Sequence, residues 1–348
     1  MLARNKFRKA AIFGLTTLLV APAVSASELP GDGKTIKVAK PTWNTGWFQT
    51  QIYLEGLKEL GYKINGPSTL DVPVFFQSVA QNDVQVWFDS AFPLHNNHLN
   101  EVDDRVKPVG YITEGGGGSL EGYMVDKKTA ERLDVTNLDD FRREKVKDAF
   151  DIDDDGKAEM VACPPGWGCE EAIAYHMKAY NLNSHIDLIK AKYSASMADA
   201  FGRYKNDGSI FFYTWTPNWT VGTLKPGKDV VWIEVPHPDL PEGQKHHEDD
   251  VTISNVEGCV NDPCMLGFPA NDLRPVANKR FLKNNPAAAR FIEQVRIPLS
   301  DIYDQNAKMF DGEDADADIR RHAQSWIKEN RAAFDRWLAN ARKASKSP

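Results

Sequence analysis

The stretch TIKVAKPTWNTGWFQTQIYLEGLKELG, residues 35–61, decides the fold class. Residues 35–39 alternate between polar and apolar side chains, which is typical of a β-strand. Residues 48–60 place apolar side chains at helical spacing, and Gly61 supplies the residue type that commonly ends a helix. The stretch therefore predicts a strand followed directly by a helix.

The alternation of strands and helices continues after this stretch. Residues 62–74 predict a strand, a proline-containing turn and a second short strand, and a helix is expected over residues 76–82. The sequence VQVWF at residues 84–88 predicts the next strand. Strands that alternate with helices are typical of an α/β protein whose sheet is largely parallel.

The mature chain of about 320 residues exceeds one ordinary core and predicts two domains. We expect lobe 1 to comprise residues 27–121 and 239–348, and lobe 2 to comprise residues 122–238, with Gly115–Gly118 as the joint. A cleft between two lobes is a common site for a small ligand. Further strands are predicted at residues 122–125, 211–215 and 230–235, with a helix from residue 128 and a mostly helical tail over residues 285–344.

The N-terminus has the parts of a secretory signal. A basic region precedes the apolar residues 10–20, and the small residues Val24-Ser25-Ala26 suit a cleavage site. We therefore predict a signal peptide over residues 1–26 and a mature chain that is soluble outside the cytoplasm; an uncleaved anchor or a lipoprotein is the alternative. The basic region consists of Arg4, Lys6, Arg8 and Lys9.

The net charge restricts the partners of the mature chain. The whole chain carries a formal net charge of -7, and removal of the four basic residues of the signal takes it to -11. Such an acidic body argues against nucleic acid or an anionic membrane as the main partner. It is compatible with a cationic ligand.

The four cysteines form two local pairs, Cys163 with Cys169 and Cys259 with Cys264. In an oxidising compartment the simplest pairing is two short-loop disulfides. A zinc site built from all four thiolates is the alternative, although it lacks the C-x2-C spacing. Loops this short gain little from loop-closure entropy, so the disulfides are expected to fix local geometry.

The first cysteine pair encloses an unusual tryptophan. In ACPPGWGCEEA, residues 162–172, Trp167 lies between two glycines, and neither helical nor strand periodicity would bury it. A rigid loop that presents an aromatic face suggests recognition. A surface turn with an incidental tryptophan is the alternative.

Seven stretches together resemble the periplasmic glycine betaine/proline betaine-binding proteins of ABC importers. The resemblance covers nearly the whole mature chain and implies a two-lobed periplasmic-binding-protein fold, type II-like, with the ligand cleft between the lobes. It also implies a monomer that delivers a trimethylated ammonium solute to a membrane permease and needs no cofactor. The stretches are FQT at residues 48–50, PLH at 93–95, DKKTA at 126–130, CPPGWGCE at 163–170, FFYTWTPNW at 211–219, LKPGKDVVW at 224–232 and NPAAARF at 285–291.

In that family tryptophans enclose the cation, and the matching positions here are Trp167 and Trp215. A quaternary ammonium has no N–H to donate, so aromatic faces select it instead, at about 0.5–2 kcal/mol per ring. The resemblance further implies that backbone N–H groups and a histidine hold the anionic end of the ligand. The matching positions are Gly168, Cys169 and His95.

The sequence departs from the family in the first lobe. The family has a tryptophan two residues before the proline of PLH, and Ala91 stands there. Extra indole near the cage should select a smaller solute, so we place trimethylamine N-oxide ahead of glycine betaine. Its single oxygen needs only one or two donors or a nearby carboxyl group, for which Asp89 is a candidate. Other aromatic residues of this lobe are candidates for the cage wall: Trp43, Trp47, Trp87 and Phe92.

The stretch DIDDDGKAE, residues 151–159, has the spacing of a calcium loop, with a glycine at its sixth position. We expect a structural Ca²⁺; the alternative is an acidic turn without an ion. The bidentate glutamate of position 12 is missing, since Ala162 stands there, and Glu170 or Glu171 would have to substitute. The candidate ligands are Asp151, Asp153, Asp155, the carbonyl of Lys157, and Glu159.

An extracytoplasmic enzyme that acts on choline-like compounds is the competing function. The chain has no G-x-S-x-G motif and no recognisable Ser/His/Asp set. Oxidised cysteine pairs would leave no thiol nucleophile. The sequence therefore predicts a binding protein rather than an enzyme.

Overall fold

The computed structural model describes residue 1 and residues 29–113 and 118–346. The predicted signal peptide, apart from Met1, and residues 115–117 of the glycine joint lie outside the described residues. Among the described helices, none combines the length and the apolar character that crossing a membrane would require.

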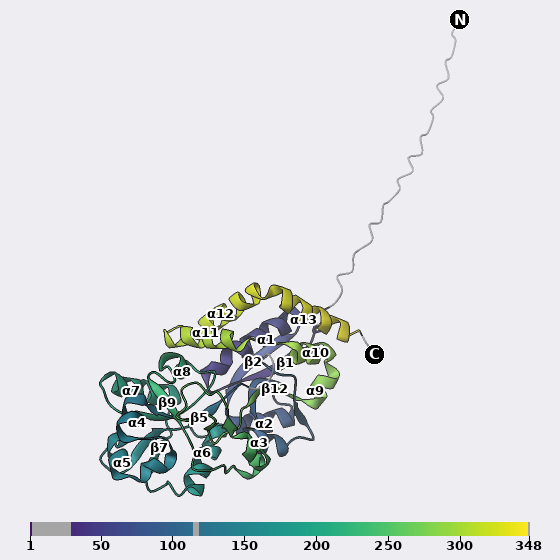
Figure 1. Ribbon diagram of the computed structural model, residues 1–348. Helices are drawn as coiled ribbons and strands as arrows, with labels where there is room; N and C mark the ends of the chain where they lie inside the picture. The colour runs from purple at the N-terminus through teal and green to yellow at the C-terminus, as the bar shows by residue number, and fades with distance from the viewer. Residues whose placement is uncertain (2–28, 114–117, 347–348) are drawn as a thin grey trace.

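The first lobe is built on a five-stranded sheet in the order β2-β1-β3-β12-β4. Helices lie on both of its faces (Figure 1). β1 pairs in parallel with β2 and β3, whereas β12 runs antiparallel to β3 and β4. The strands are β1 (Thr35–Pro41), β2 (Lys63–Leu70), β3 (Val86–Phe92), β4 (Val106–Pro108) and β12 (Asp272–Asn278).

The second lobe is built on a five-stranded sheet in the order β7-β6-β8-β5-β9. β6 pairs in parallel with β7 and β8, whereas β5 runs antiparallel to β8 and β9. The strands are β5 (Glu121–Asp126), β6 (Ala158–Val161), β7 (Ile186–Ile189), β8 (Phe211–Trp215) and β9 (Val230–Ile233).

Both sheets are mixed, and in each of them four of the five strands run in the same direction, so the prediction of a largely parallel sheet fails at only one strand per sheet. The antiparallel strands are β5 and β12, and each comes just after the chain has passed from one lobe to the other. A parallel neighbour requires a crossover connection, usually a helix, within the same sheet. Because β5 and β12 arrive from the other lobe without such a helix, they pair antiparallel.

The helices cover the sheets, and the C-terminal ones lie over α1 at the outer end of lobe 1 (Figure 1). α11 also contacts α8 of lobe 2. The helices of lobe 1 are α1 (Trp47–Glu59), α2 (Val72–Gln81), α3 (Asn96–Asn100), α9 (Lys279–Asn284), α10 (Pro286–Gln294), α11 (Leu299–Phe310), α12 (Asp316–Glu329) and α13 (Arg331–Ala344). Those of lobe 2 are α4 (Lys127–Leu133), α5 (Glu144–Phe150), α6 (Gly168–Ala179), α7 (Tyr193–Lys205) and α8 (Trp219–Thr223).

The segment after α1 differs from its sequence-based prediction. A single strand, β2, replaces the expected strand, turn and second strand, and α2 begins at Val72 rather than at residue 76. β2 is an edge strand, where a proline is tolerated because the missing N–H faces away from the ladder. Pro73 lies in the first turn of α2, where proline favours helix initiation.

The return of the chain to lobe 1 occurs later than residue 239. The backbone N–H groups of Trp232 and Val235 donate to the carbonyls of Gly258 (3.0 Å) and Met265 (3.0 Å). Residues 251–265 therefore bond to the β9 region of lobe 2, and they contain a separate two-stranded sheet of β10 (Thr252–Ile253) and β11 (Cys264–Met265). We propose that lobe 2 extends to the residues just before β12.

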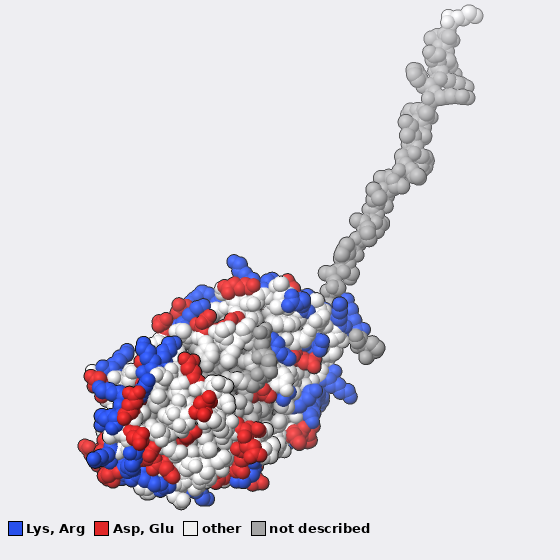
Figure 2. All heavy atoms as spheres, viewed as in Figure 1, with Lys and Arg blue, Asp and Glu red and all other residues white. Residues whose placement is uncertain are grey.

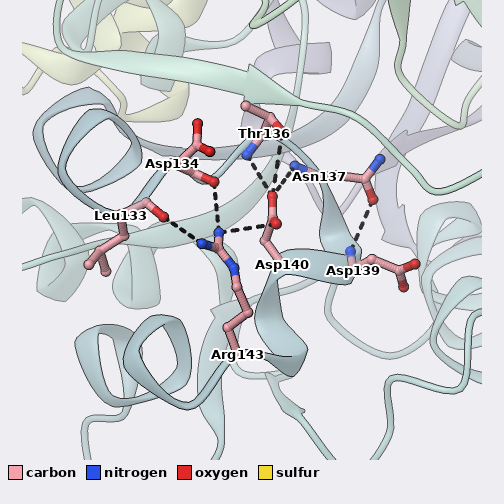
Figure 3. Close-up of polar contacts among 7 residues, drawn as sticks. All are labelled: Leu133, Asp134, Thr136, Asn137, Asp139, Asp140 and Arg143. Atoms are coloured by element: carbon pink, nitrogen blue, oxygen red, sulfur yellow. Dashed lines mark hydrogen bonds and ion pairs between the residues drawn. The ribbon is translucent and has the colours of Figure 1, made fainter.

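A polar network fixes the connection between α4 and α5 (Figure 3). The guanidinium of Arg143 donates to the carbonyls of Leu133 (2.8 Å) and Asp134 (2.7 Å) at the end of α4. The carboxylate of Asp140 accepts from the backbone N–H groups of Thr136 (2.8 Å) and Asn137 (2.9 Å). The start of α5 is therefore held against the end of α4.

Both predicted disulfides form, Cys163–Cys169 and Cys259–Cys264, with Cα–Cα distances of 6.0 and 6.1 Å. All four sulfurs are used in this way, which excludes the zinc alternative. On the face of the molecule in Figure 2, basic and acidic side chains lie interspersed.

Candidate ligand-binding site

A cavity lies between the lobes, and both lobes line it. Trp43, Asp89 and His95 come from lobe 1, at the end of the sheet where β1 and β3 finish. Trp167 and Trp215 come from lobe 2, before α6 and at the end of β8. The structure therefore brings together predicted residues that are up to 172 positions apart in the sequence.

Three indole rings form a continuous aromatic wall of this cavity. The ring centroids of Trp43 and Trp167 are 5.4 Å apart with an interplanar angle of 71°. Those of Trp167 and Trp215 are 5.5 Å apart at 79°. Faces set nearly at right angles can contact several methyl groups of one trimethylammonium head and stabilise its charge through the ring quadrupoles.

Asp89 holds Trp43 in this wall. Its Oδ2 accepts from the indole Nε1–H of Trp43 at 2.6 Å, and its Oδ1 accepts from the side-chain amide of Gln49 at 3.4 Å. Burial raises the pKa of Asp89 to about 6, and the two hydrogen bonds offset part of that rise. Gly46 leaves room for this carboxyl group, because a Cβ there would lie 2.2 Å from Oδ2.

His95 enters the cavity as a neutral ring. It is 2% exposed, and burial lowers its pKa to about 3. The backbone N–H of Ala91 donates to Nδ1 at 3.3 Å, which places the proton of the neutral ring on Nε2. A Cβ on Gly168 would lie 2.8 Å from that Nε2, so only glycine allows the two lobes to approach here. His95 is therefore a hydrogen-bond donor to the cavity.

Gly168 and Cys169 line the cavity as the first residues of α6. The first N–H groups of a helix have no intrahelical acceptor and lie at the positive end of its dipole. They can therefore bind a ligand oxygen. The Cys163–Cys169 disulfide connects this helix start to the end of β6.

The loop of residues 163–169 also bonds directly to lobe 1. The indole Nε1–H of Trp167 donates to the hydroxyl of Thr42 at 2.9 Å. The carbonyl of Gly166 accepts from the backbone N–H of Val72 at 3.1 Å. The lobes are therefore in contact through protein atoms at the edge of the cavity.

Glu121 was missed by the sequence analysis, although it lines the cavity and is 3% exposed. The Oε1 of Glu121 accepts from the side-chain amide of Asn271 at 3.2 Å. The Oδ1 of Asn271 accepts from the backbone N–H of Leu94 at 3.0 Å, and this bond sets the orientation of the amide. Oε2 has no hydrogen-bond partner among the described residues. Burial raises the pKa of Glu121 to about 7, and the nearby hydroxyl of Tyr213 offsets part of the rise. An acidic residue directly after a glycine-rich segment, at the start of a strand, was the available signal.

Three predicted aromatic residues lie outside this cavity. Trp47 donates its Nε1–H to the carbonyl of Pro41 (2.7 Å), and the ammonium of Lys40 covers its ring at 3.5 Å. Trp87 is fully buried behind Trp43, with ring centroids 5.5 Å apart, because it lies deeper in β3 than Asp89. Phe92 packs at 6.2 Å from the ring of His95. Ala91, which stands where the family has a tryptophan, lines the cavity.

The acidic loop lies apart from the cavity. The structure brings the carboxylates of Asp151, Asp153, Asp155 and Glu159 together. Glu170 and Glu171 do not fold back to complete this group. Glu170 pairs with Lys190 at 3.0 Å, and Glu171 accepts from Asn97 at 2.8 Å, because α6 directs both side chains elsewhere.

Comparisons with known proteins identify the family of this chain. The pattern of the family described as the substrate binding domain of the ABC-type glycine betaine transport system matches residues 34–329. The chain belongs to this family. Its members are substrate-binding proteins of ABC transporters rather than enzymes, which confirms that part of the sequence-based prediction.

Individual relatives cover almost the whole chain. It is 38% identical to the glycine betaine-binding periplasmic protein OusX of Dickeya dadantii, over 97% of this chain and 98% of that protein. It is 37% identical to the glycine betaine/proline betaine-binding periplasmic protein of Escherichia coli, over 94% and 96%. The predicted resemblance to the betaine-binding family is thereby confirmed.

Solved structures show the same two-lobed fold. Lactococcal OpuAC in its closed-liganded conformation with glycine betaine has a TM-score of 0.66 at 16% identity, covering 88% of this chain and 99% of that one. An ABC-transporter choline-binding protein in complex with choline has a TM-score of 0.67 at 15% identity, covering 89% and 96%. The ligand cleft between two α/β lobes, expected from the sequence, is the architecture of this betaine-binding-type protein.

Opening the Cys163–Cys169 disulfide is expected to weaken ligand binding more than it lowers stability. The double substitution Cys163→Ser/Cys169→Ser should raise the Kd roughly threefold to tenfold, since the start of α6 loses its preorganised position. The loop is too short for a large entropic loss of stability. Calorimetric titration and thermal unfolding measure the two effects.

The second disulfide provides the matched control for this experiment. Cys259→Ser/Cys264→Ser opens an equally short loop, and neither residue lines the cavity. Its Kd should equal that of the parent protein. If both double variants bind the ligand as tightly as the parent protein, the Cys163–Cys169 disulfide does not hold the start of α6 in position for binding.

Proposed function

We propose that this betaine-binding-type protein binds trimethylamine N-oxide in preference to glycine betaine and delivers it to the permease of an ABC importer. We further propose that the mature chain acts in the periplasm as a monomer. The periplasmic location of its relatives and the predicted signal peptide support the location. Both lobes of one chain line the cavity, so a second subunit is not needed to complete it.

The observation that carries the proposal is the buried carboxyl group of Glu121. Its Oε1 is occupied by Asn271, which leaves Oε2 as the oxygen that carries a proton when the group is neutral. A neutral carboxyl group donates one short hydrogen bond to an oxygen that bears negative charge. The N-oxide oxygen of trimethylamine N-oxide is such an acceptor, and it lies directly on the nitrogen that the indoles would hold.

The charged side chains that line the cavity disfavour a ligand that carries a separate carboxylate. Asp89 and Glu121 both line the cavity, and none of its described lining residues is a lysine or arginine. A glycine betaine carboxylate would therefore find the N–H groups of Gly168 and Cys169 and the ring of His95, but no cationic side chain. An ionised Asp89 would oppose its negative charge, and a neutral Glu121 could donate to only one of its two oxygens.

Choline is a second candidate, because the same two acidic groups favour a cation with no anionic end. Its hydroxyl could donate to an ionised Glu121, and a choline-binding protein shares this fold. The two candidates require opposite protonation states of Glu121. Binding of trimethylamine N-oxide would take up a proton above pH 7, whereas binding of choline would release one below it.

A competition experiment tests the ligand order. We expect glycine betaine, added at equimolar concentration, to leave most of the trimethylamine N-oxide bound, as followed by NMR of the methyl signals. Choline, proline betaine and carnitine complete the panel. Displacement of trimethylamine N-oxide by equimolar glycine betaine would reverse the proposed order, and catalytic turnover of any of these compounds would contradict a binding function.

A further inference from the structure

The acidic loop between α5 and β6 gathers four carboxyl groups within nine residues. One oxygen from each of Asp151, Asp153, Asp155 and Glu159 lies within 4.8 Å of every other. None of the four residues lines the ligand cavity. The cluster therefore requires an explanation that the transport function does not supply.

A second observation points to something that binds inside this cluster. Glu159 is 7% exposed, and its Oε2 accepts from the backbone N–H of Ile152 at 2.5 Å. Its Oε1 is buried and has no hydrogen-bond partner among the described residues, and neither has the buried Oδ1 of Asp151. A buried carboxylate oxygen without a donor is unfavourable unless a cation or a water molecule satisfies it.

The nearby lysine does not neutralise the cluster. The ammonium of Lys157 pairs with Asp187 on β7 at 2.9 Å and stays 3.9 Å from Asp155. Four acidic groups therefore converge with too little positive charge to balance them.

We propose that this loop binds a calcium ion through Asp151, Asp153, Asp155 and Glu159. Calcium takes oxygen ligands at about 2.3–2.6 Å, so two ligands on opposite sides of the ion lie up to about 5 Å apart. The observed spread of the four oxygens fits that limit. Magnesium demands octahedral geometry at about 2.0–2.1 Å and usually keeps several waters with one or two carboxylates, so a loop that offers four carboxylates suits calcium better. The carbonyl of Lys157 is the predicted fifth ligand, and water replaces the missing ligand of position 12.

The ion would connect two elements of lobe 2. Asp151 follows α5, whose start is held by Arg143 against the end of α4 (Figure 3), and Glu159 lies within β6. β6 then leads to Cys163 and the ligand loop. Calcium is therefore a structural ion that stabilises the folded lobe, and its effect is measurable without the transported solute.

Thermal unfolding in calcium chloride and in chelator tests this proposal. Calcium at about a hundred times its dissociation constant should raise the Tm of the parent protein by roughly 2–6 °C, because it binds the folded state. Asp153→Ala should abolish the rise. In chelator its Tm should equal or exceed that of the parent, since one repelling charge is gone. Calcium titration calorimetry on the parent should give one site per chain.

Asp154 offers the matched control. It lies in the same loop and carries the same charge, but its carboxyl group is not in the cluster, and its φ of 61° suits asparagine. Asp154→Asn should keep the full calcium-dependent rise. An unchanged Tm of the parent protein in calcium, an equal rise with magnesium chloride, or loss of the rise in Asp154→Asn would overturn the proposal.

Discussion

Trp167→Ala is expected to weaken ligand binding by roughly 30- to 150-fold, about 2–3 kcal/mol, which combines the loss of a cation–π face with the loss of its packing. Trp167 lies between the other two indoles of the wall, so its removal separates Trp43 from Trp215. It also removes the hydrogen bond to Thr42 across the lobes. Calorimetric titration with trimethylamine N-oxide measures the change.

The control for this variant is Trp337→Ala. Trp337 is a half-buried tryptophan on α13 that packs against Phe334, and it is not part of the cavity. Its substitution should leave the Kd unchanged. Circular dichroism should show that Trp167→Ala retains the fold. Parent-like affinity of a folded Trp167→Ala variant would show that the aromatic wall does not hold the ligand.

Glu121→Ala is expected to weaken binding of trimethylamine N-oxide by about 10- to 150-fold, the usual range of a hydrogen bond that involves a charged group. Glu121→Gln should bind within about threefold of the parent, because the amide can accept from Asn271 and still donate to the ligand oxygen. Comparison of the two variants shows what the shape and the donor of Glu121 contribute apart from its charge, because glutamine keeps the shape and the donor of the side chain and alanine keeps neither. Displacement titrations at pH 6.5 give both values.

The pH dependence distinguishes the two forms of Glu121. Its pKa of about 7 means that the free protein holds the required proton below pH 7, so Glu121 itself adds little pH dependence to the affinity there. Above pH 7 each bound ligand must take up a proton, and affinity should fall about tenfold per pH unit. Asp89, with a pKa of about 6, stays ionised between pH 7 and 9, and His95, with a pKa of about 3, stays neutral. The affinity of the Glu121→Gln variant for trimethylamine N-oxide should therefore not change between pH 7 and 9.

A different slope would contradict the assigned role of Glu121. If affinity for trimethylamine N-oxide rises from pH 7 to 9, the carboxyl group does not donate. If choline binds more tightly than trimethylamine N-oxide and gains affinity with pH, the ionised form of Glu121 is the one that the site uses.

The architecture could be predicted from periodicity where strands and helices are regular. The segments 35–39, 48–60 and 211–215 each lie in the predicted element. The prediction from periodicity was wrong after α1. Pro67 lies in an edge strand and Pro73 in the first turn of a helix, but in the sequence either proline is equally typical of a turn. Periodicity also could not show that β12 would pair antiparallel, since pairing direction depends on where the chain re-enters the lobe.

The site was predictable where a motif fixes a backbone position. Trp167, Trp215 and His95 lie in short, rigid stretches, and the structure places all three at the cavity. Trp87 was misplaced because strand alternation gives the face of a side chain but not its depth below the sheet edge. Glu121 was missed because its role depends on Asn271, which is 150 residues away in the sequence.

The bonds between the ligand loop and lobe 1 affect the equilibrium between the open and closed forms of the cleft. Trp167 to Thr42 and Gly166 to Val72 connect the lobes through protein atoms alone. Both bonds form only when the lobes lie together, so each of them adds to the stability of the closed form. Apparent affinity rises with the fraction of molecules in the binding-competent shape, so these two bonds contribute to affinity without touching the solute.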